Sequence, residues 1–295
     1  MRSWQSVLFE KFLIWRKTKQ KFLDVKEMEL FIEERRQAPA YELDEKFRTQ
    51  HNIAKYEWDG MLYYVLNESL DVQKNLLYFH GGAYINDPLI FHWRYLVKLA
   101  ERTQFRIIVP IYPKLPHYTH EALYDKLHSF YDMLCGKHAE PFIFMGDSAG
   151  GGIALAFAQD VMLQKKRQSE QIILFSPWLD VSGEDPRYLE IEKIDPMLGL
   201  VGAQMLGKLW ANSQEISHHL VSPLHGPLHN IGRITLFVGT GEMLIVDAHM
   251  LLEKAMQEGV DIIYFEYPKM NHVFPVFPIP EAKKVWKQLL PILQR

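Results

Sequence analysis

Short, continuous apolar runs alternate with longer amphipathic stretches along most of this chain, and this alternation constrains its fold more than any other feature. Each run has the length of a strand but lacks alternating polar residues, which predicts a strand buried on both faces. The runs cover residues 75–79, 106–111, 141–145, 171–175, 234–238 and 261–265. Helices are expected near residues 89–103, 119–135, 150–166, 245–258 and 281–294. This order predicts an α/β fold, with a mostly parallel sheet covered by helices on both faces.

Composition excludes several classes of protein. The length of 295 residues suits one large α/β domain, and the net charge of −3 gives no basic field for holding nucleic acid. The lone cysteine, Cys135, excludes a disulfide framework and a multi-thiolate metal site, and it fits a reducing compartment. No apolar run approaches the roughly 20 residues that span a bilayer. We therefore expect a cytoplasmic protein with no stable membrane insertion and no nucleic-acid partner.

Two segments depart from the alternating pattern. The first 26 residues carry seven basic and two acidic side chains, and Trp4, Leu8, Phe12 and Trp15 fall on one helical stripe. We expect this stripe to dock on the body of the protein, and the alternative is a basic amphipathic helix lying on a membrane surface. Residues 182–230 are rich in Gly, Pro and His and predict an excursion at the edge of the sheet that places helices over a site.

A G-x-S-x-G pentapeptide, Gly146-Asp147-Ser148-Ala149-Gly150, lies between a predicted strand and a helix of small residues. Strand, sharp turn and helix are the setting of a nucleophile elbow, in which Ser148 sits in a strained turn and the two glycines leave room around it. The alternative is a glycine-rich turn that binds phosphate, but the P-loop lysine and the G-x-G-x-x-G spacing are absent. Asp147 is expected to be a buried structural carboxylate.

Two glycines follow the predicted strand 75–79, in the sequence His80-Gly81-Gly82-Ala83-Tyr84. The amides of Gly81 and Gly82, with that of Ala149 after the serine, are predicted to form an oxyanion hole. The alternative is an ordinary Gly-Gly exit from a strand.

A nucleophilic serine needs a general base and an acid that orients it. His272 follows the last predicted strand and is the only histidine beyond residue 249. The acid is expected after the preceding strand, where both Glu242 and Asp247 occur. We predict Glu242, because it lies in the loop, whereas Asp247 lies where the next helix begins and its charge suits a helix N-terminus.

From about residue 53 to its end, the chain resembles the hormone-sensitive-lipase branch of the α/β-hydrolase fold, which includes bacterial carboxylesterases with HGG and GDSAG motifs. The resemblance rests on HGGAY at 80–84, GDSAGGGIA at 146–154, and the segments 111–116, 176–180, 222–224 and 267–274. It implies a catalytic domain over residues 51–295, and a lid or cap over an acyl pocket formed by residues 1–50. Two positions depart from the family pattern: Ala83 replaces a third glycine, and Glu242 replaces an aspartate.

The resemblance implies a serine carboxylesterase that acts on small esters of short to medium acyl length, with a Ser148–His272–Glu242 triad and no cofactor or metal. Tyr84, Trp210 and Phe274 are candidates for substrate contact. An amide or peptide hydrolase could use the same triad. A non-catalytic binder is the rival from another class, but receptors that resemble this family lack the triad histidine, which is present here. The pairs His218/His219 and His225/His229 lack the spacing of a metal site. No sequence pattern indicates the oligomeric state.

Overall fold

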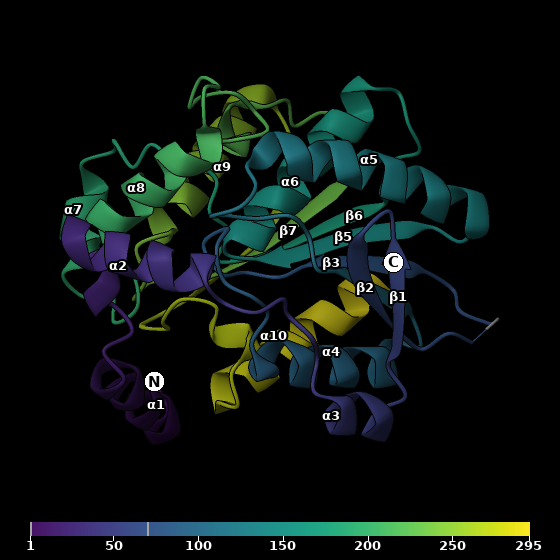
Figure 1. Cartoon of the computed structure of the whole chain (residues 1–295), viewed down its shortest axis with the longest axis horizontal. Coiled ribbons are helices and arrows are strands. Elements are labelled where there is room, and N and C mark those ends of the chain that lie inside the picture. Colours follow the sequence, from purple (N-terminus) through teal and green to yellow (C-terminus); the bar gives the residue numbers. More distant parts are fainter. Residues whose placement is uncertain (1, 70) are drawn as a thin grey trace.

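An eight-stranded sheet forms the centre of the protein, in the order β1-β2-β4-β3-β5-β6-β7-β8 (Figure 1). A computed structural model describes residues 2–69 and 71–295. Strands β3 to β8 are mutually parallel, and β2 runs antiparallel to both of its neighbours, β1 and β4. The strands are Ala54–Trp58, Met61–Leu66, Asn75–Phe79, Arg106–Pro110, Phe142–Asp147, Gln171–Phe175, Arg233–Gly239 and Ile262–Tyr267, for β1 to β8. All six predicted strands are present, with ends that differ by at most two residues.

The first two strands form the hairpin that joins the N-terminal segment to the sheet. Trp58 pairs with Met61 across a turn made by Asp59 and Gly60, which have φ of 45° and 75°. Positive φ at both central residues is what a tight hairpin turn requires, and Asp-Gly is a preferred sequence for it.

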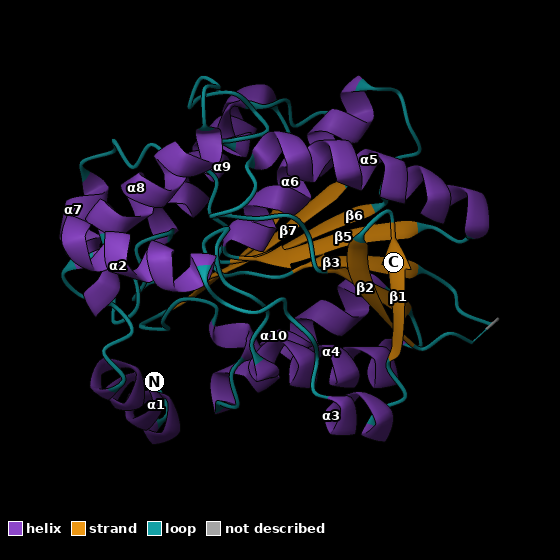
Figure 2. Cartoon of the chain, viewed as in Figure 1, coloured by secondary structure: helices purple, strands orange, loops and turns teal. Residues whose placement is uncertain are grey.

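Helices cover both faces of the sheet, as the apolar runs predicted (Figure 2). One face is covered by α5 (His120–Lys137), α6 (Ala149–Leu163) and α9 (Ile245–Glu258). The other is covered by α4 (Ile90–Thr103) and α10 (Pro280–Leu293). Each layer has its own apolar core, and every residue of β3, β4, β5 and β6 is buried. Continuous apolar strands therefore reflect burial from two sides.

A second group of helices lies at one side of the molecule, on the left in Figure 1. This group, hereafter the cap, comprises η1 (Gln20–Phe22), α2 (Val25–Arg36), α7 (Arg187–Glu192) and α8 (Leu200–Ala211). The N-terminal part of the cap, η1 and α2, packs closely on α8. A Cβ added to Gly202 would lie only 2.6 Å from both the Phe22 Cα and the Met28 Cε. The segment 182–230 follows β6. Strands β7 and β8 lie between β6 and the nearer edge of the sheet, so the predicted position of this segment at the edge of the sheet was wrong.

The predicted docking of the N-terminal stripe was also wrong. Helix α1 (Trp4–Trp15) contacts the body through Ser6, Phe9 and Leu13, and the stripe of Trp4, Leu8, Phe12 and Trp15 is exposed. Periodicity identifies the apolar side chains that share a face but not which face meets the body. Short helices α3 (Glu45–Gln50), η2 (Pro223–His225) and η3 (Phe274–Val276) complete the fold. Among the residues described, no helix has both the length and the apolarity to cross a bilayer.

Candidate active site

Ser148 lies in a sharp turn between β5 and α6, at the carboxyl end of the sheet. Its backbone has φ of 53° and ψ of −126°, an unusual conformation that the surrounding structure holds in place. The Ser148 amide donates to the carbonyl of Phe175 at 2.9 Å. A Cβ on Gly146 would lie 2.2 Å from the carbonyl oxygen of Gly150, and one on Gly150 would lie 2.1 Å from that of Phe79. Only glycine fits at either position.

The carboxyl ends of three parallel strands bring Ser148, His272 and Glu242 together, although they are far apart in sequence. The Ser148 Oγ lies 2.8 Å from Nε2 of His272, and the Nδ1 of His272 lies 2.6 Å from Oε2 of Glu242. All three side chains are buried. This arrangement can transfer a proton from a hydroxyl to an imidazole that a carboxylate holds in one orientation.

Two further groups hold Glu242 in place. Its Oε1 accepts hydrogen bonds of 2.7 Å from both the Ser176 hydroxyl and the Gly239 amide. The Ser176 Oγ in turn accepts the amide of Val273, at 3.1 Å. Our sequence reasoning gave Ser176 no role, yet its place directly after the strand 171–175 was a signal that could have suggested one.

Asp195 is a second residue that sequence reasoning missed, and it is buried beside the triad. Its Oδ2 accepts the Met243 amide at 2.7 Å, next to Glu242, and its Oδ1 accepts the amides of Met197 and Leu198. Burial raises the pKa of Asp195. No motif marks this residue, because it lies in the segment 182–230, far from the sheet strands in sequence.

Burial and the neighbouring carboxylate act in opposite directions on His272. Burial alone lowers the pKa of this imidazole, but the hydrogen bond and the negative charge of Glu242 outweigh it, and the pKa is raised. The protonated form of the His272 imidazole is thus stabilised.

The loop after β3 requires a correction to the predicted oxyanion donors. The Gly81 amide donates to Oδ1 of Asp147 at 2.9 Å, so it is not available to a substrate. The amides of Gly82, Ala83 and Ala149 have no acceptor among residues 2–69 and 71–295. The free donors are therefore Gly82 and Ala83, one position later than predicted, together with Ala149 at the first turn of α6, where the helix dipole favours negative charge.

Asp147 is the buried structural carboxylate that the sequence predicted. Besides the Gly81 amide, it accepts the Tyr78 hydroxyl at 2.5 Å and lies 3.1 Å from Nε2 of His92. Burial would raise its pKa, but the charge and hydrogen bond of His92, with the bonds from Tyr78 and Gly81, lower it. Asp147 thus ties the loop after β3 to the turn that carries Ser148.

Asp247 points away from His272. Its Oδ1 accepts the amides of Leu179 and Asp180 at 2.7 and 2.8 Å, and its Oδ2 accepts the Tyr188 hydroxyl at 2.9 Å. Burial raises the pKa of Asp247 to about 7. The predicted role as a charge at a helix N-terminus is therefore incomplete, because this carboxyl group connects α9 to the chain that enters the cap.

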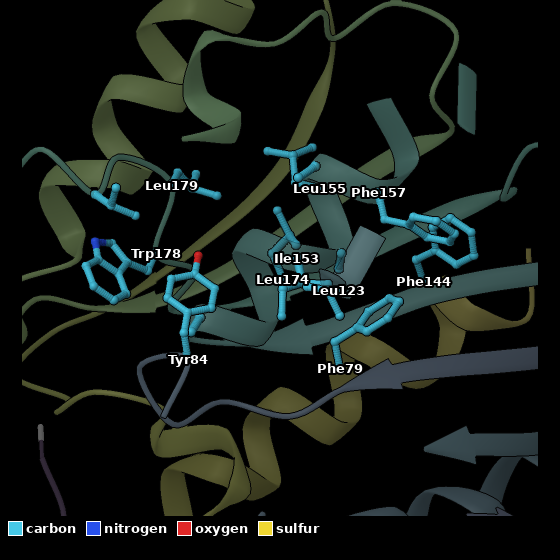
Figure 3. Close-up of a cluster of buried hydrophobic side chains, with 14 of the residues drawn as sticks. Phe79, Tyr84, Leu123, Phe144, Ile153, Leu155, Phe157, Leu174, Trp178 and Leu179 are labelled. Carbon is cyan, nitrogen blue, oxygen red and sulfur yellow. The ribbon is translucent and has the colours of Figure 1, made fainter. Parts of the chain in front are cut away.

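The aromatic candidates for substrate contact separate into two places. Tyr84 stacks on Trp210 with ring centroids 4.4 Å apart and on Trp178 at 5.2 Å; Figure 3 shows Tyr84 and Trp178 facing each other. The Trp178 amide donates to the Ser148 carbonyl at 2.9 Å, so this stack adjoins the elbow. Phe274 instead packs on Tyr267 in the core of the opposite sheet face, apart from Tyr84 and Trp210.

Two of the remaining histidines meet at one carboxylate. His128 and His219 approach opposite oxygens of Asp160, at 2.5 and 3.4 Å. Within the described part of the chain, no group of three or more His, Cys, Asp or Glu side chains is placed to hold a metal ion.

Comparisons with known proteins agree with the fold. A family model described as α/β hydrolase fold matches residues 76–276. The chain is 29% identical to an esterase of Acinetobacter venetianus, over 71% of each chain. It is 27% identical to a triacylglycerol lipase of Mycobacterium tuberculosis, over 79% of this chain but only 49% of that protein.

A solved structure gives the same result for the fold. The crystal structure of a candidate esterase from Staphylococcus aureus has a TM-score of 0.87 and 26% identity, and the match covers 94% of this chain and 96% of that one. The family model spans 201 of the 295 residues. The chain therefore belongs to the α/β-hydrolase fold family.

Proposed function

We propose that this protein is a serine carboxylesterase that hydrolyses small esters, with Ser148 as nucleophile, His272 as general base and acid, and Glu242 as the orienting carboxylate. One observation carries the proposal: hydrogen bonds of 2.8 and 2.6 Å join Ser148 Oγ to His272 and His272 to Glu242. The relatives named esterase, triacylglycerol lipase and acetyl-hydrolase favour an ester over an amide as substrate.

In the first half of the reaction, Ser148 Oγ attacks the carbonyl carbon of the ester while His272 Nε2 accepts its proton. The carbonyl oxygen becomes negative and receives the amides of Gly82, Ala83 and Ala149; losing one such donor typically slows a reaction by roughly 10²–10³. His272 then gives its proton to the departing alkoxide. An alcohol leaves, and the acyl group stays on Ser148.

In the second half, water attacks the acyl-enzyme with His272 again as the base, and the acid is released as Ser148 regains its proton. Glu242 holds one tautomer of His272 throughout and stabilises the imidazolium. Ser176 and Asp195 act as positioning residues, since they bind Glu242 and the amide that follows it. The side chains and water supply every proton and nucleophile that the cycle needs.

The acyl chain is expected to be short to medium in length. The buried rings of Tyr84, Trp178 and Trp210 adjoin the elbow, and we propose that they limit the space for the acyl chain. The cap is proposed to cover the entrance. In support, η1, α2 and Asn86 line an open groove of about 400 Å³, and the amide of Asn86 donates to the Gly82 carbonyl at 2.9 Å. We therefore propose that η1 and α2, rather than the whole of residues 1–50, form the lid.

Replacing the nucleophile tests the mechanism. Ser148→Ala should lower the rate of hydrolysis of p-nitrophenyl acetate and butyrate to the residual level that remains after loss of a triad. That level is about 10³–10⁴ times the uncatalysed rate in water. Ser129→Ala, an exposed serine on α5, is the matched control and should hydrolyse both esters normally. Assays with esters of increasing acyl length, beside the matching amides, measure substrate preference. Near-normal turnover by folded Ser148→Ala would refute the proposal.

A further inference from the structure

Exposed apolar side chains concentrate at the start of the chain. Among residues 2–69 and 71–295, nineteen large apolar side chains are exposed, and nine of them lie between residues 4 and 30. On α1 the exposed fractions are 71% for Trp4, 59% for Leu8, 44% for Phe12 and 74% for Trp15. Single exposed apolar residues are ordinary, whereas a contiguous group marks an interaction surface.

These four side chains lie opposite the face by which α1 is attached. At about 100° per residue, they fall within an arc of about 80° on the helix. The attached face is held by Ser3, whose amide and hydroxyl donate to Glu281 at 2.6 and 2.8 Å, and by Phe9, which packs on Phe277 with centroids 4.6 Å apart. Figure 1 shows α1 projecting from the main body. The arc of Trp4, Leu8, Phe12 and Trp15, hereafter the outer face, is left without a partner within the described structure.

Unpaired positive charge surrounds the outer face. Lys11, Arg16 and Lys17 are exposed and form no ion pair with any described residue, whereas Arg2 is paired with Glu10 at 2.7 Å. The segment is basic although the whole chain has a net charge of −3. Cations of this kind complement anionic lipid headgroups, and tryptophan at both ends of the helix suits the depth of a membrane interface.

The dimensions of α1 favour a helix lying in the plane of a membrane. Twelve residues give a helix of about 18 Å, well short of the roughly 30 Å hydrocarbon core. A second copy of the chain is a weaker occupant, because a symmetric contact between two outer faces would bring Lys11, Arg16 and Lys17 of both copies close together.

We propose that the outer face of α1, with Lys11, Arg16 and Lys17, is a docking surface for an anionic lipid bilayer. The apolar arc enters the interface while the three cations meet the headgroups, and the attached face keeps its contacts with Glu281 and Phe277. The binding is peripheral and weakens as salt screens the charges. This proposal does not depend on the catalytic assignment.

Co-sedimentation of the full chain with vesicles tests the proposal. The protein should bind vesicles of phosphatidylglycerol and phosphatidylcholine in equal amounts, and bind pure phosphatidylcholine far less. The variant Trp4→Ser/Leu8→Ser/Trp15→Ser should lower the partition coefficient at least about tenfold. The variant Lys11→Ala/Arg16→Ala/Lys17→Ala should lower it by roughly a hundredfold. Tyr118→Ser/Leu163→Ser/Met256→Ser, which removes three exposed apolar side chains elsewhere, should bind like the parent.

Hydrolysis of a water-soluble ester and the unfolding temperature should be unchanged in all three variants, because every substituted side chain is exposed. The proposal is overturned if the parent does not bind anionic vesicles, or if the two α1 variants bind as well as the control. It is also overturned if light scattering shows a dimer that the apolar α1 variant dissociates while vesicle binding is absent, since a second copy then occupies the outer face.

Discussion

Glu242 and Asp247 are two buried carboxyl groups five residues apart, and their surroundings give them different tasks. Glu242 faces His272 at 2.6 Å, whereas Asp247 accepts two backbone amides and the Tyr188 hydroxyl. A substitution that removes the charge of a carboxyl group but keeps the shape of its side chain should therefore distinguish the role of Glu242 from that of Asp247.

Glu242→Gln should lower kcat on the order of 10⁴-fold, because an amide neither holds the correct tautomer of His272 nor stabilises its positive charge. Asp247→Asn is the matched control and should retain kcat within about tenfold, because its amide oxygen still accepts the Leu179 and Asp180 amides and its nitrogen donates to Tyr188. Steady-state hydrolysis of p-nitrophenyl butyrate by both variants measures this. A larger loss in Asp247→Asn would mean that the acid is misassigned.

The Glu242→Gln substitution should also change the pH dependence of kcat/KM. In the proposed mechanism, neutral His272 is the active form of the base, and its pKa is raised above the ordinary value of 6.5. The kcat/KM of the parent should therefore rise with pH to a midpoint above 6.5. In Glu242→Gln the effect of burial remains without the opposing charge, so the residual activity should have its midpoint at lower pH. An unmoved midpoint would show that Glu242 does not set this pKa.

At the scale of elements, the loop after β3 is the most strained segment of the site. Gly82, Ala83 and Tyr84 have φ of 132°, 55° and 59°, and only the first is a glycine. A residue with a Cβ adopts this region at a cost of about 1–3 kcal/mol. In the proposed mechanism, this conformation leaves the Ala83 amide free to act as an oxyanion donor, and the amide has no backbone acceptor within the described part of the chain.

Ala83→Gly should therefore stabilise the protein by about 0.5–1 kcal/mol, since the relief of strain exceeds the added freedom of the unfolded chain. The amide is retained, so ester hydrolysis should stay within about twofold. Urea unfolding measures the change, and Ala122→Gly in α5 is the control, expected to destabilise by about 0.5–1 kcal/mol. Equal destabilisation by both substitutions would contradict the account of strain.

At the scale of the whole molecule, the cap joins a segment from the start of the chain to one inserted after β6. The contact is tight at Gly202, where an added methyl group meets the backbone of Phe22, which cannot move as freely as a side-chain end. Gly202 is one of the positions where the proposed lid meets the inserted segment, and disturbing this contact tests the role of the lid.

Gly202→Ala should loosen η1 and α2, at a cost of roughly 1–3 kcal/mol for overpacking. Trypsin should then cleave after Arg16, Lys17 or Lys19 several-fold faster, and the preference among esters of different acyl length should change. Gly136→Ala is the matched control, because nothing lies within 4 Å of its added Cβ. Gel analysis of timed digests and the ester series provide the measurements. Unchanged cleavage and preference in Gly202→Ala would argue against a lid held at this contact.

Much of the fold was predictable because its signals are local. A continuous apolar run such as residues 171–175 indicates a strand covered on both faces, and the glycines around Ser148 indicate a sharp turn, without knowledge of distant residues. The order of the strands then placed Ser148, Glu242 and His272 at the same end of the sheet, because parallel strands share their carboxyl edge.

The sequence by itself thus determined the doubly covered parallel sheet and the segments that meet at its carboxyl edge. Only the tertiary structure decided which amides are free. Asp147, 66 residues after Gly81, accepts a hydrogen bond from the Gly81 amide, whereas the Ala83 amide stays free. It also decided that Ser176 and Asp195 support Glu242, and that α1 leaves its apolar stripe uncovered. The physical reason is the same in each case: hydrogen-bond partners and burial depend on groups brought together from distant parts of the chain, whereas strand and turn patterns depend on neighbouring residues.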